Sequence, residues 1–311
     1  MKEIFEEHLY NSMKNDHRIV AFFADSDFSK YEELKSEFPD RFFNFGITEC
    51  NTVAAAAGMA KSSEGNVIPV VYTAGAFIVY RAYEFVRNDV CIHNLNVKFV
   101  GMGSGLKINN FGPTHHTTED IAVLRVLPNM CILLPASPKE VPVIFDSCLK
   151  HIGPTYIRLG KAFEEEIYSS TPEFEIGKST LLRSGKDITI ISTGSIISNA
   201  IAAADMLAKD GYNAEIINMT SLKPIDSDRI IKSAKKTGKI VTVEEHQIVG
   251  GLGGAVSEIL CSNSISACFE RVGLKDEFCT KYGWHRDLLE IVGLSTEDIL
   301  SACRRVISRR V

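Results

Sequence analysis

The chain has 311 residues, of which 45% are hydrophobic and 23% charged, with a formal net charge of −5. This length exceeds one average domain and suits two, each with its own buried core. The acidic balance argues against a nucleic-acid or anionic-membrane partner. No apolar run approaches the roughly 20 residues that span a bilayer, and segment 1–16 lacks the apolar core of a signal peptide. We therefore expect a cytoplasmic protein.

The eight cysteines are scattered along the chain and form no CxxC pair. Without a secretory context, reduced and mostly buried thiols are the expected state. No metal site is predicted from them.

Short apolar runs alternate with helical patterns in the first half of the chain. The runs are apolar on both faces, which suits a parallel sheet covered by helices. The expected strands are residues 18–24, 67–72, 97–102 and 131–134. The expected helices are residues 48–61, 77–88 and 138–150.

The pattern changes after Lys161, where an acidic, Ser- and Thr-rich stretch over residues 162–186 predicts a linker with an edge strand. A second alternating series follows, and such alternation predicts βαβ units with a mostly parallel sheet. Its expected elements are strands at 187–192, 213–218 and 239–244, helices at 199–210 and 227–235, and a glycine-rich loop at 249–254 before a further helix. We predict an α/β protein with two doubly wound domains, residues 1–165 and 178–311, joined by a linker over 166–177.

Glu49 stands where an expected strand gives way to a helix of very small residues. A carboxylate at a helix N-terminus can simply favour the helix dipole. The helix sequence AAAAGMA carries almost no polarity, however, which predicts that Glu49 lies beside a buried, tightly packed element. A buried acid either pairs with a partner or has a raised pKa that suits proton exchange.

Four aromatic residues follow at near-helical spacing: Phe77, Tyr80, Tyr83 and Phe85. Such a stripe usually belongs to the core. A planar ligand would nevertheless need one ring for stacking.

Residues 112–120 form the most polar segment of the first half and contain the adjacent histidines His115 and His116. Neighbouring loop residues rarely both face one ion, and no acidic or thiol ligand stands at standard spacing, so no metal site is predicted. One histidine could handle a proton or bind a substrate oxygen, or both could lie on the surface.

Arg158 lies at the end of an apolar strand. Its guanidinium could bind a phosphate or carboxylate through two hydrogen bonds, or form an ion pair at a domain interface. Two glycine-rich loops give weaker signals. Residues 101–105 open no convincing helix, so a dinucleotide fingerprint is not supported. Residues 250–254 lie between a strand and a helix, and could bind an anion or form a plain tight turn.

Taken in order, these segments resemble one enzyme family. RFFNFGITECNTVAAAAGMA resembles the signature around the catalytic glutamate of transketolases and deoxyxylulose-phosphate synthases. YTAGAFIVYRAYEFVRNDV resembles the aromatic segment that packs on the thiamine pyrimidine. GPTHHTTEDIAVLRVLPNMCILLPAS, GPTYIRLGK and VTVEEHQIVGGLGGAVSE are similar to the family's histidine loop, its substrate-phosphate arginine segment and its C-terminal domain. The resemblance covers nearly the whole chain.

The resemblance implies a pyrimidine-binding domain followed by a transketolase C-terminal domain, with thiamine diphosphate as cofactor. Glu49 would hydrogen-bond a pyrimidine nitrogen of the cofactor and take part in its activation. Phe77 would stack on the pyrimidine with Tyr80 nearby, and Asp25 would lie near the cofactor end. The second implied catalytic residue is His115, which would contact the donor's carbonyl or hydroxyl oxygen.

On the substrate side, the resemblance implies that Arg158 and Ser29 hold a phosphate. The sequence departs from the family at three nearby positions. Phe111 replaces an aspartate that reads a sugar hydroxyl, Gly103 replaces a substrate-binding histidine of transketolases, and Ala74 replaces a cofactor-side phenylalanine. These changes predict a wider and less polar site. We therefore expect a modified, deoxygenated or nucleotide-linked sugar in place of a standard ketose phosphate.

The sequence contains no GDG motif, which the family uses to bind Mg²⁺ and the diphosphate. The resemblance therefore implies the second subunit of a split transketolase, whose partner subunit holds most of the cofactor and the Mg²⁺. It further implies homodimerisation of this chain, an α2β2 assembly, and transfer of a two-carbon ketol unit between sugars or sugar phosphates. Two alternatives remain: a deoxyxylulose-synthase-like subunit that joins a pyruvate-derived acetyl unit to an aldehyde or ketone, and a non-catalytic regulatory subunit. The β subunit of 2-oxo acid dehydrogenases is a weaker match, because its aromatic segment differs.

Overall fold

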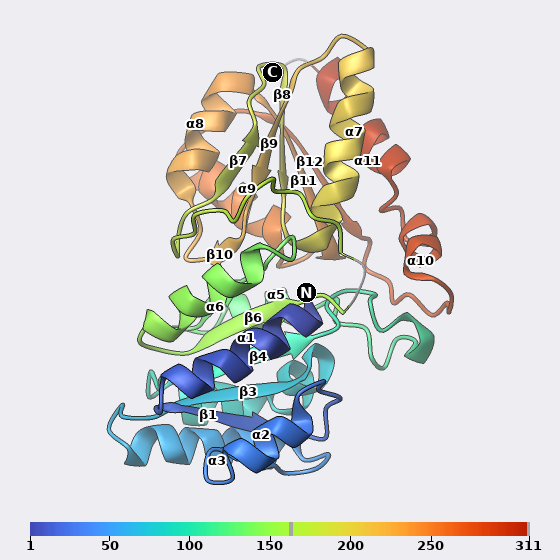
Figure 1. Cartoon of the computed structure of the whole chain (residues 1–311). Helices are drawn as coiled ribbons and strands as arrows, with labels where there is room; N and C mark the ends of the chain where they lie inside the picture. The colour runs from blue at the N-terminus through green and yellow to red at the C-terminus, as the bar shows by residue number, and fades with distance from the viewer. Residues whose placement is uncertain (162–163, 310–311) are drawn as a thin grey trace.

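The computed structural model describes residues 1–161 and 164–309 and contains two open sheets (Figure 1). The first sheet has the strand order β10-β5-β6-β4-β3-β1-β2 and is parallel except for β10, which pairs antiparallel with β5. Its strands are β1 (Ile19–Phe23), β2 (Phe42–Asn44), β3 (Ile68–Ala74), β4 (Lys98–Met102), β5 (Cys131–Leu133), β6 (Thr155–Leu159) and β10 (Ser221–Lys223).

Helices cover both faces of the first sheet. They are α1 (Lys2–Asn15), α2 (Tyr31–Glu37), α3 (Glu49–Ser62), α5 (Asp120–Arg125) and α6 (Glu140–Lys150). Successive side chains of a strand point to opposite faces, so β1 contributes to two cores. Ala21 and Phe23 pack in the cluster with α1 and α6, whereas Val20 and Phe22 pack in the cluster with α3. The strands therefore carry apolar residues on both faces, as predicted.

The second sheet has the order β12-β11-β8-β9-β7 and is parallel except for its edge strand β7. Its strands are β7 (Thr180–Arg183), β8 (Ile188–Ser192), β9 (Ala214–Asn218), β11 (Lys239–Gln247) and β12 (Cys268–Leu274). Its helices are α7 (Ile197–Lys209), α8 (Ser227–Thr237), α9 (Leu252–Ser262), α10 (His285–Ile291) and α11 (Thr296–Ser308). The predicted fold class and the predicted edge strand within 162–186 are confirmed.

The two halves of the chain are joined by strand pairing as well as by the linker. Strand β10 belongs by sequence to the predicted domain 178–311, yet it forms an edge of the first sheet. Figure 1 shows β10 between the two sheets. One hydrophobic cluster also joins Phe22 of the first half to Met219 and Leu252 of the second. The boundaries at 165 and 178 stay a prediction, and β10 crosses the predicted division.

The helix expected over 77–88 is present but is not a regular α-helix. Two π-helical segments, η1 (Phe77–Arg81) and η2 (Val86–Cys91), flank one short α-helical turn, α4 (Tyr83–Phe85). Hydrophobic periodicity does not distinguish these wider turns, so the sequence could not predict them. Single π-helical turns occur frequently at functional sites.

None of the helices in the described part of the chain has the length and apolarity needed to span a bilayer. All eight cysteines are free thiols, and five of them are buried. The buried thiols therefore act as small apolar core residues.

Candidate active site

A cavity of about 400 Å³ opens at the carboxyl ends of four neighbouring strands of the first sheet. Asp25 follows β1, Ala74 ends β3, Met102 ends β4 and Lys161 follows β6, and all four residues line the cavity. In open α/β sheets, ligands bind in the crevice outside the carboxyl ends of the strands. This position makes the cavity the candidate active site.

Glu49 lines this cavity as the first residue of α3, although only 2% of its surface is exposed. Its Oε2 accepts a hydrogen bond of 2.6 Å from Nη1 of Arg81, while none of the described residues donates to Oε1. The small residues Ala56 and Ala57 let α3 pack closely on the sheet and so position Glu49 at the cavity wall. Of the two outcomes expected for a buried acid, the structure shows pairing with a cation.

Phe77 and His115 come from separate segments and meet at the cavity. Their ring centroids lie 5.0 Å apart at 73°, in an edge-on arrangement. The guanidinium of Arg81 lies 5.0 Å from the centre of the Phe77 ring. Because Arg81 also binds Glu49, the π-helical segment η1 holds an aromatic ring and the cation that pairs with the buried acid.

His115 is held between two other side chains. Its ring stacks on Phe111 with centroids 4.8 Å apart, and its Nδ1 lies 2.9 Å from Oγ1 of Thr114. Burial lowers the pKa of His115, so the imidazole is neutral near pH 7.

The described residues contain no group of three or more His, Cys, Asp or Glu that could hold a metal ion.

The structure places Asp25 at the cavity but leaves Ser29 and Tyr80 outside its lining. The amide N–H of Asp25 donates to Oδ1 of Asn44 at 3.0 Å, which fixes the loop after β1. Ser29 is exposed, and its amide N–H donates to Oε2 of Glu6 at 2.9 Å. The hydroxyl of Tyr80 donates to Glu119. Of the seven predicted site residues, four line the cavity: Asp25, Glu49, Phe77 and His115.

Arg158, which is expected to bind a phosphate, does not line the cavity. It is 5% exposed, and its Nε donates to Oδ2 of Asp120 at 2.8 Å. Its Nη2 donates to the carbonyl oxygens of Thr117 and Glu245 at 2.7 and 3.0 Å. This geometry is an ion pair at the boundary between the two halves of the chain, which is the other role that the sequence allows for Arg158.

Two of the three departures from the family pattern shape the cavity, and the third does not. Phe111 and Ala74 line it, so the wall is apolar where a polar contact was possible. Gly103 lies outside the lining at φ +81°, and a Cβ there would stand 2.3 Å from Ile108. Gly103 is therefore explained by backbone conformation and close packing.

The glycine-rich loop 250–254 binds a carboxyl group that belongs to the chain itself. Leu252 and Gly253 donate their amide N–H groups to the carboxyl of Glu244 at 2.7 and 2.8 Å. A Cβ on Gly251 would stand 2.0 Å from Glu244 Oε2, so glycine permits this approach. The helix N-terminus predicted as a possible anion site is thus already satisfied by Glu244.

Sequence reasoning missed two charged residues of the site. Arg81 stands four residues after Phe77, a spacing that places the two side chains on one helix face. Lys161 stands just after a strand that ends at the cavity. The position of charged residues relative to strand ends is the signal that could have identified Lys161.

Known proteins resemble the chain over nearly its whole length. The transketolase pyrimidine binding domain matches residues 1–163 and the transketolase C-terminal domain matches residues 177–299. A putative transketolase C-terminal section from Methanocaldococcus jannaschii is 37% identical over 96% of this chain and 93% of that protein. A 6-deoxy-6-sulfo-D-fructose transketolase subunit, SqwH, from Clostridium sp. strain MSTE9 is 34% identical over 100% of this chain and 95% of that protein. A solved chain described as a split gene transketolase, inactive beta4 tetramer, is 36% identical with a TM-score of 0.89, over 98% of this chain and 97% of that chain.

The chain therefore belongs to the transketolase family. It contains the pyrimidine-binding and C-terminal domains of that family and matches subunits or sections of divided transketolases. The resemblance drawn from its sequence motifs is confirmed.

Proposed function

We propose that this chain is one subunit of a thiamine-diphosphate-dependent, transketolase-like enzyme that transfers a two-carbon ketol unit from a ketose donor to an aldehyde acceptor. One observation carries the proposal: a single cavity collects the buried carboxyl of Glu49, the ring of Phe77 and the imidazole of His115. The family match to a pyrimidine-binding domain supports the same cofactor.

The cavity lining suits a flat, largely apolar heterocycle with a ring nitrogen. Phe77 offers an aromatic face, and Ala74 and Ile47 add apolar wall. Glu49 offers Oε1, an oxygen to which no described residue donates. When bound, thiamine diphosphate supplies a nucleophilic carbon and an electron sink for making and breaking carbon–carbon bonds beside a carbonyl.

The residues of this chain supply orientation and proton transfer. The carboxyl of Glu49 could share a proton with a ring nitrogen of the bound cofactor, and Arg81 fixes the orientation of that carboxyl through Oε2. Hydrogen bonds of such a buried acid are stronger than in water, because the local dielectric is low. His115 is neutral, and with Nδ1 engaged by Thr114 its Nε2 is the nitrogen available to a substrate oxygen.

The substrate proposed is a modified sugar or sugar phosphate. Phe111 at the cavity cannot accept a hydrogen bond from a sugar hydroxyl, whereas Lys161 can attract an anionic group. The SqwH relative, which is named for 6-deoxy-6-sulfo-D-fructose, supports this substrate class. A donor panel that includes standard ketose phosphates, deoxygenated and sulfonated ketoses, and pyruvate tests it. Full activity with standard ketose phosphates would overturn the modified-sugar part, and activity with pyruvate alone would favour the synthase alternative.

The proposed enzyme requires a second subunit that carries the GDG-type domain for Mg²⁺ and the diphosphate, in an α2β2 assembly in the cytoplasm. Two features support this division. The chain covers 95% of the SqwH relative, which is itself named as a transketolase subunit, and the similar solved chain is described as an inactive beta4 tetramer.

Calorimetry tests the proposed division of the cofactor site. Thiamine diphosphate with Mg²⁺ is titrated into this chain, into a candidate partner with a GDG motif, and into their mixture. We expect tight binding only in the mixture. Tight binding by this chain alone would place a diphosphate site within it and overturn the proposed division. Absence of binding in all three samples, with both chains folded, would favour a non-catalytic subunit.

A further inference from the structure

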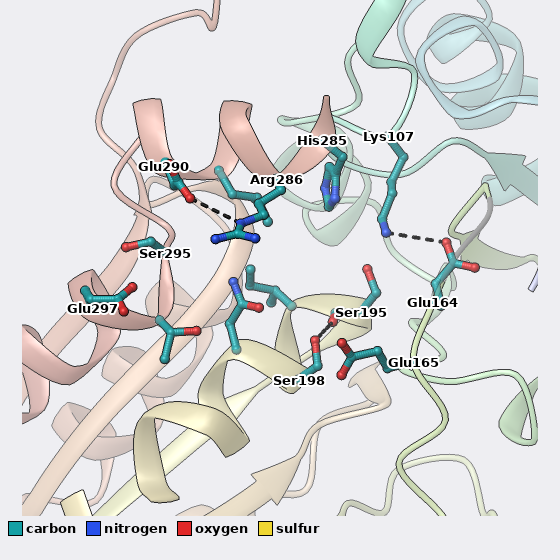
Figure 2. Close-up of a pocket in the computed structure, with 14 residues that line it drawn as sticks. Lys107, Glu164, Glu165, Ser195, Ser198, His285, Arg286, Glu290, Ser295 and Glu297 are labelled. Carbon is teal, nitrogen blue, oxygen red and sulfur yellow. Dashed lines mark hydrogen bonds and ion pairs between the residues drawn. The ribbon is translucent and has the colours of Figure 1, made fainter. Parts of the chain in front are cut away.

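Two further cavities share Lys107, His285 and Arg286 but differ in the other residues that line them. The first, about 430 Å³, lies between the two halves of the chain (Figure 2). Lys107 reaches into it from the first half and Arg286 from α10, each toward a carboxylate: Lys107 Nζ lies 3.6 Å from Glu164, and Arg286 Nε lies 3.3 Å from Glu290. Glu165 and Glu297 also line it, so carboxylates outnumber the lysine and arginine side chains. This cavity is a poor site for an anion.

The second cavity, about 440 Å³, has the opposite character. Its lining consists of Lys107, Asn109, Asn110, Lys161, Trp284, His285 and Arg286. None of the described residues that line it is a carboxylate, although Lys107, His285 and Arg286 pair with Glu164, Glu245 and Glu290 outside the lining. Lys161 and the largely exposed side chain of Arg286 leave positive charge available to an anion there. We refer to this cavity as the outer cavity.

The outer cavity adjoins the candidate active site. Lys161 lines both. The 3₁₀ turn η3 (Asn109–Phe111) forms the wall between them, because Phe111 lines the active-site cavity and Asn109 lines the outer one. Nδ2 of Asn109 donates to the carbonyl oxygen of Gly283 at 2.7 Å, which attaches the loop before α10 to this wall. A molecule bound at His115 therefore has the outer cavity as its neighbour.

Several lining groups of the outer cavity are available to a ligand. The Arg286 side chain is 88% exposed, and Trp284 is 79% exposed. Lys161 forms no ion pair with the described residues. The amide side chain of Asn110 and the flat indole of Trp284 add a hydrogen-bonding group and an apolar face, the combination that sugars use in binding sites.

We propose that the outer cavity is a substrate subsite that binds the anionic end of the sugar, with Arg286 and Trp284 of the C-terminal domain as specificity-determining residues. The proposal rests on the proposed function and adds the C-terminal domain to the substrate site. The anionic group is a phosphate or a sulfonate. Arg286 and Lys161 provide its charge, while the indole of Trp284 packs against the carbon chain.

Trp284 is the only tryptophan of the chain, so its fluorescence reports on this cavity. The full chain is titrated with ribose 5-phosphate, with ribose and with inorganic sulfate. We expect a saturable change in fluorescence with ribose 5-phosphate, a weaker change with sulfate, and none with ribose. In the Arg286→Glu variant, the dissociation constant for ribose 5-phosphate should rise about tenfold, because the charge at the site is reversed. Equal responses in both proteins, or no response, would overturn the proposal.

Steady-state kinetics of the complex with its partner subunit provide the second measurement. Arg286→Glu should raise KM for phosphorylated or sulfonated sugars about tenfold, leave kcat unchanged, and leave neutral sugars unaffected. Separate phosphate and sulfonate substrates show which anion is preferred. Arg304→Glu is the matched control, because Arg304 is an exposed arginine of the same domain that pairs with Asp210 outside the cavity. The control should change none of these values.

The outcomes separate this proposal from the proposed function. A fluorescence response that Arg286→Glu weakens, in a complex without ketol-transfer activity, would support the subsite and overturn the proposed reaction. Ketol transfer with unchanged KM values in Arg286→Glu would overturn the subsite alone. Weaker association with the partner subunit in Trp284→Ala and Arg286→Glu, at unchanged KM, would identify the surface as a subunit interface and overturn the proposal.

Discussion

The two sheets of this protein both place buried glutamates near the carboxyl ends of strands, but they satisfy them differently. In the second half, Glu244 accepts two backbone N–H groups, and Oε1 of Glu245 accepts the amide N–H of Leu106 and lies 2.8 Å from His285. In the first half, Glu49 has a single described donor, Arg81, and faces a cavity. Burial of a carboxyl costs free energy unless the group is paired. A buried carboxyl oxygen that accepts no hydrogen bond therefore needs an explanation.

The difference separates two structural acids from the acid that we propose to be functional. The second half uses Glu244 and Glu245 to close a helix N-terminus and to join the two halves of the chain. The first half keeps one oxygen of Glu49 available beside Phe77 and His115. Burial alone therefore does not identify a catalytic acid, whereas burial with an unused acceptor at a cavity does.

Replacement of Glu49 by glutamine should have the largest effect. The amide has nearly the same shape but cannot hold a transferable proton, so kcat for ketol transfer should fall about 10³-fold. The unfolding free energy should change by less than about 1 kcal/mol, because Arg81 is half exposed and can be solvated. Activity of the complex and urea unfolding are measured together, with the exposed Glu84→Gln as control. Retention of most activity would refute the role of Glu49.

Arg158→Met tests whether the buried ion pair of Arg158 with Asp120 stabilises the fold. Removal of the guanidinium leaves Asp120 buried without its cation, which should cost about 3 kcal/mol of unfolding free energy. Urea unfolding measures this loss, and Arg304→Met, which removes an exposed pair with Asp210, should cost less than about 1 kcal/mol. A variant with wild-type stability but a raised KM for phosphorylated sugars would restore the role originally predicted for Arg158.

Glu244→Gln should affect stability only, and the effect should be seen as a change in its pH dependence. Burial raises the pKa of Glu244 to about 7, from 4.5 in the unfolded chain, despite its two N–H donors. Between these pH values the folded protein binds more protons than the unfolded one, so this group's stabilising contribution is present below pH 4.5 and is lost as pH rises toward 7. The slope is at most about 1.4 kcal/mol per pH unit.

Urea unfolding of both proteins from pH 4.5 to 8 measures that slope. The difference between wild type and Glu244→Gln should flatten above pH 7, and the exposed Glu173→Gln should reproduce the wild-type curve. Glu245 should not contribute in this range: although burial pushes its pKa upward, His285, Lys107 and the Leu106 amide hold the pKa of Glu245 at about 2. A pH-independent difference would show that Glu244 stays ionised throughout.

Sequence periodicity was sufficient for most of the fold. The strands expected at 18–24, 97–102 and 187–192 match β1, β4 and β8 within one residue at each end, because continuous apolar runs have few other solutions in a sheet covered on both faces. Strand β10 was missed, because three residues carry no periodic signal and their partner strand is distant in sequence. The π-helical turns were missed because they depend on local packing.

The candidate site was predicted in part. Asp25, Glu49, Phe77 and His115 follow from motifs, since their positions relative to strand ends are fixed by the fold. The ion pair of Arg158 could not be predicted from its strand, because its partner Asp120 comes from a helix elsewhere in the chain. Tyr80 and Ser29 are close in sequence to residues that line the cavity. The hydroxyl of Tyr80 donates a hydrogen bond to Glu119 instead, and the amide N–H of Ser29 donates one to Glu6.

The short strand β10 bears on how this polypeptide can be divided. It covers the outer backbone of β5, which would otherwise present unpaired N–H and C=O groups at the rim of the first sheet. A fragment cut within residues 166–177 would lose that cover and expose an edge to which other chains can add. Excision of the pyrimidine-binding half by itself should therefore yield an aggregating product, and a usable fragment must keep residues 221–223 or replace them with another cap.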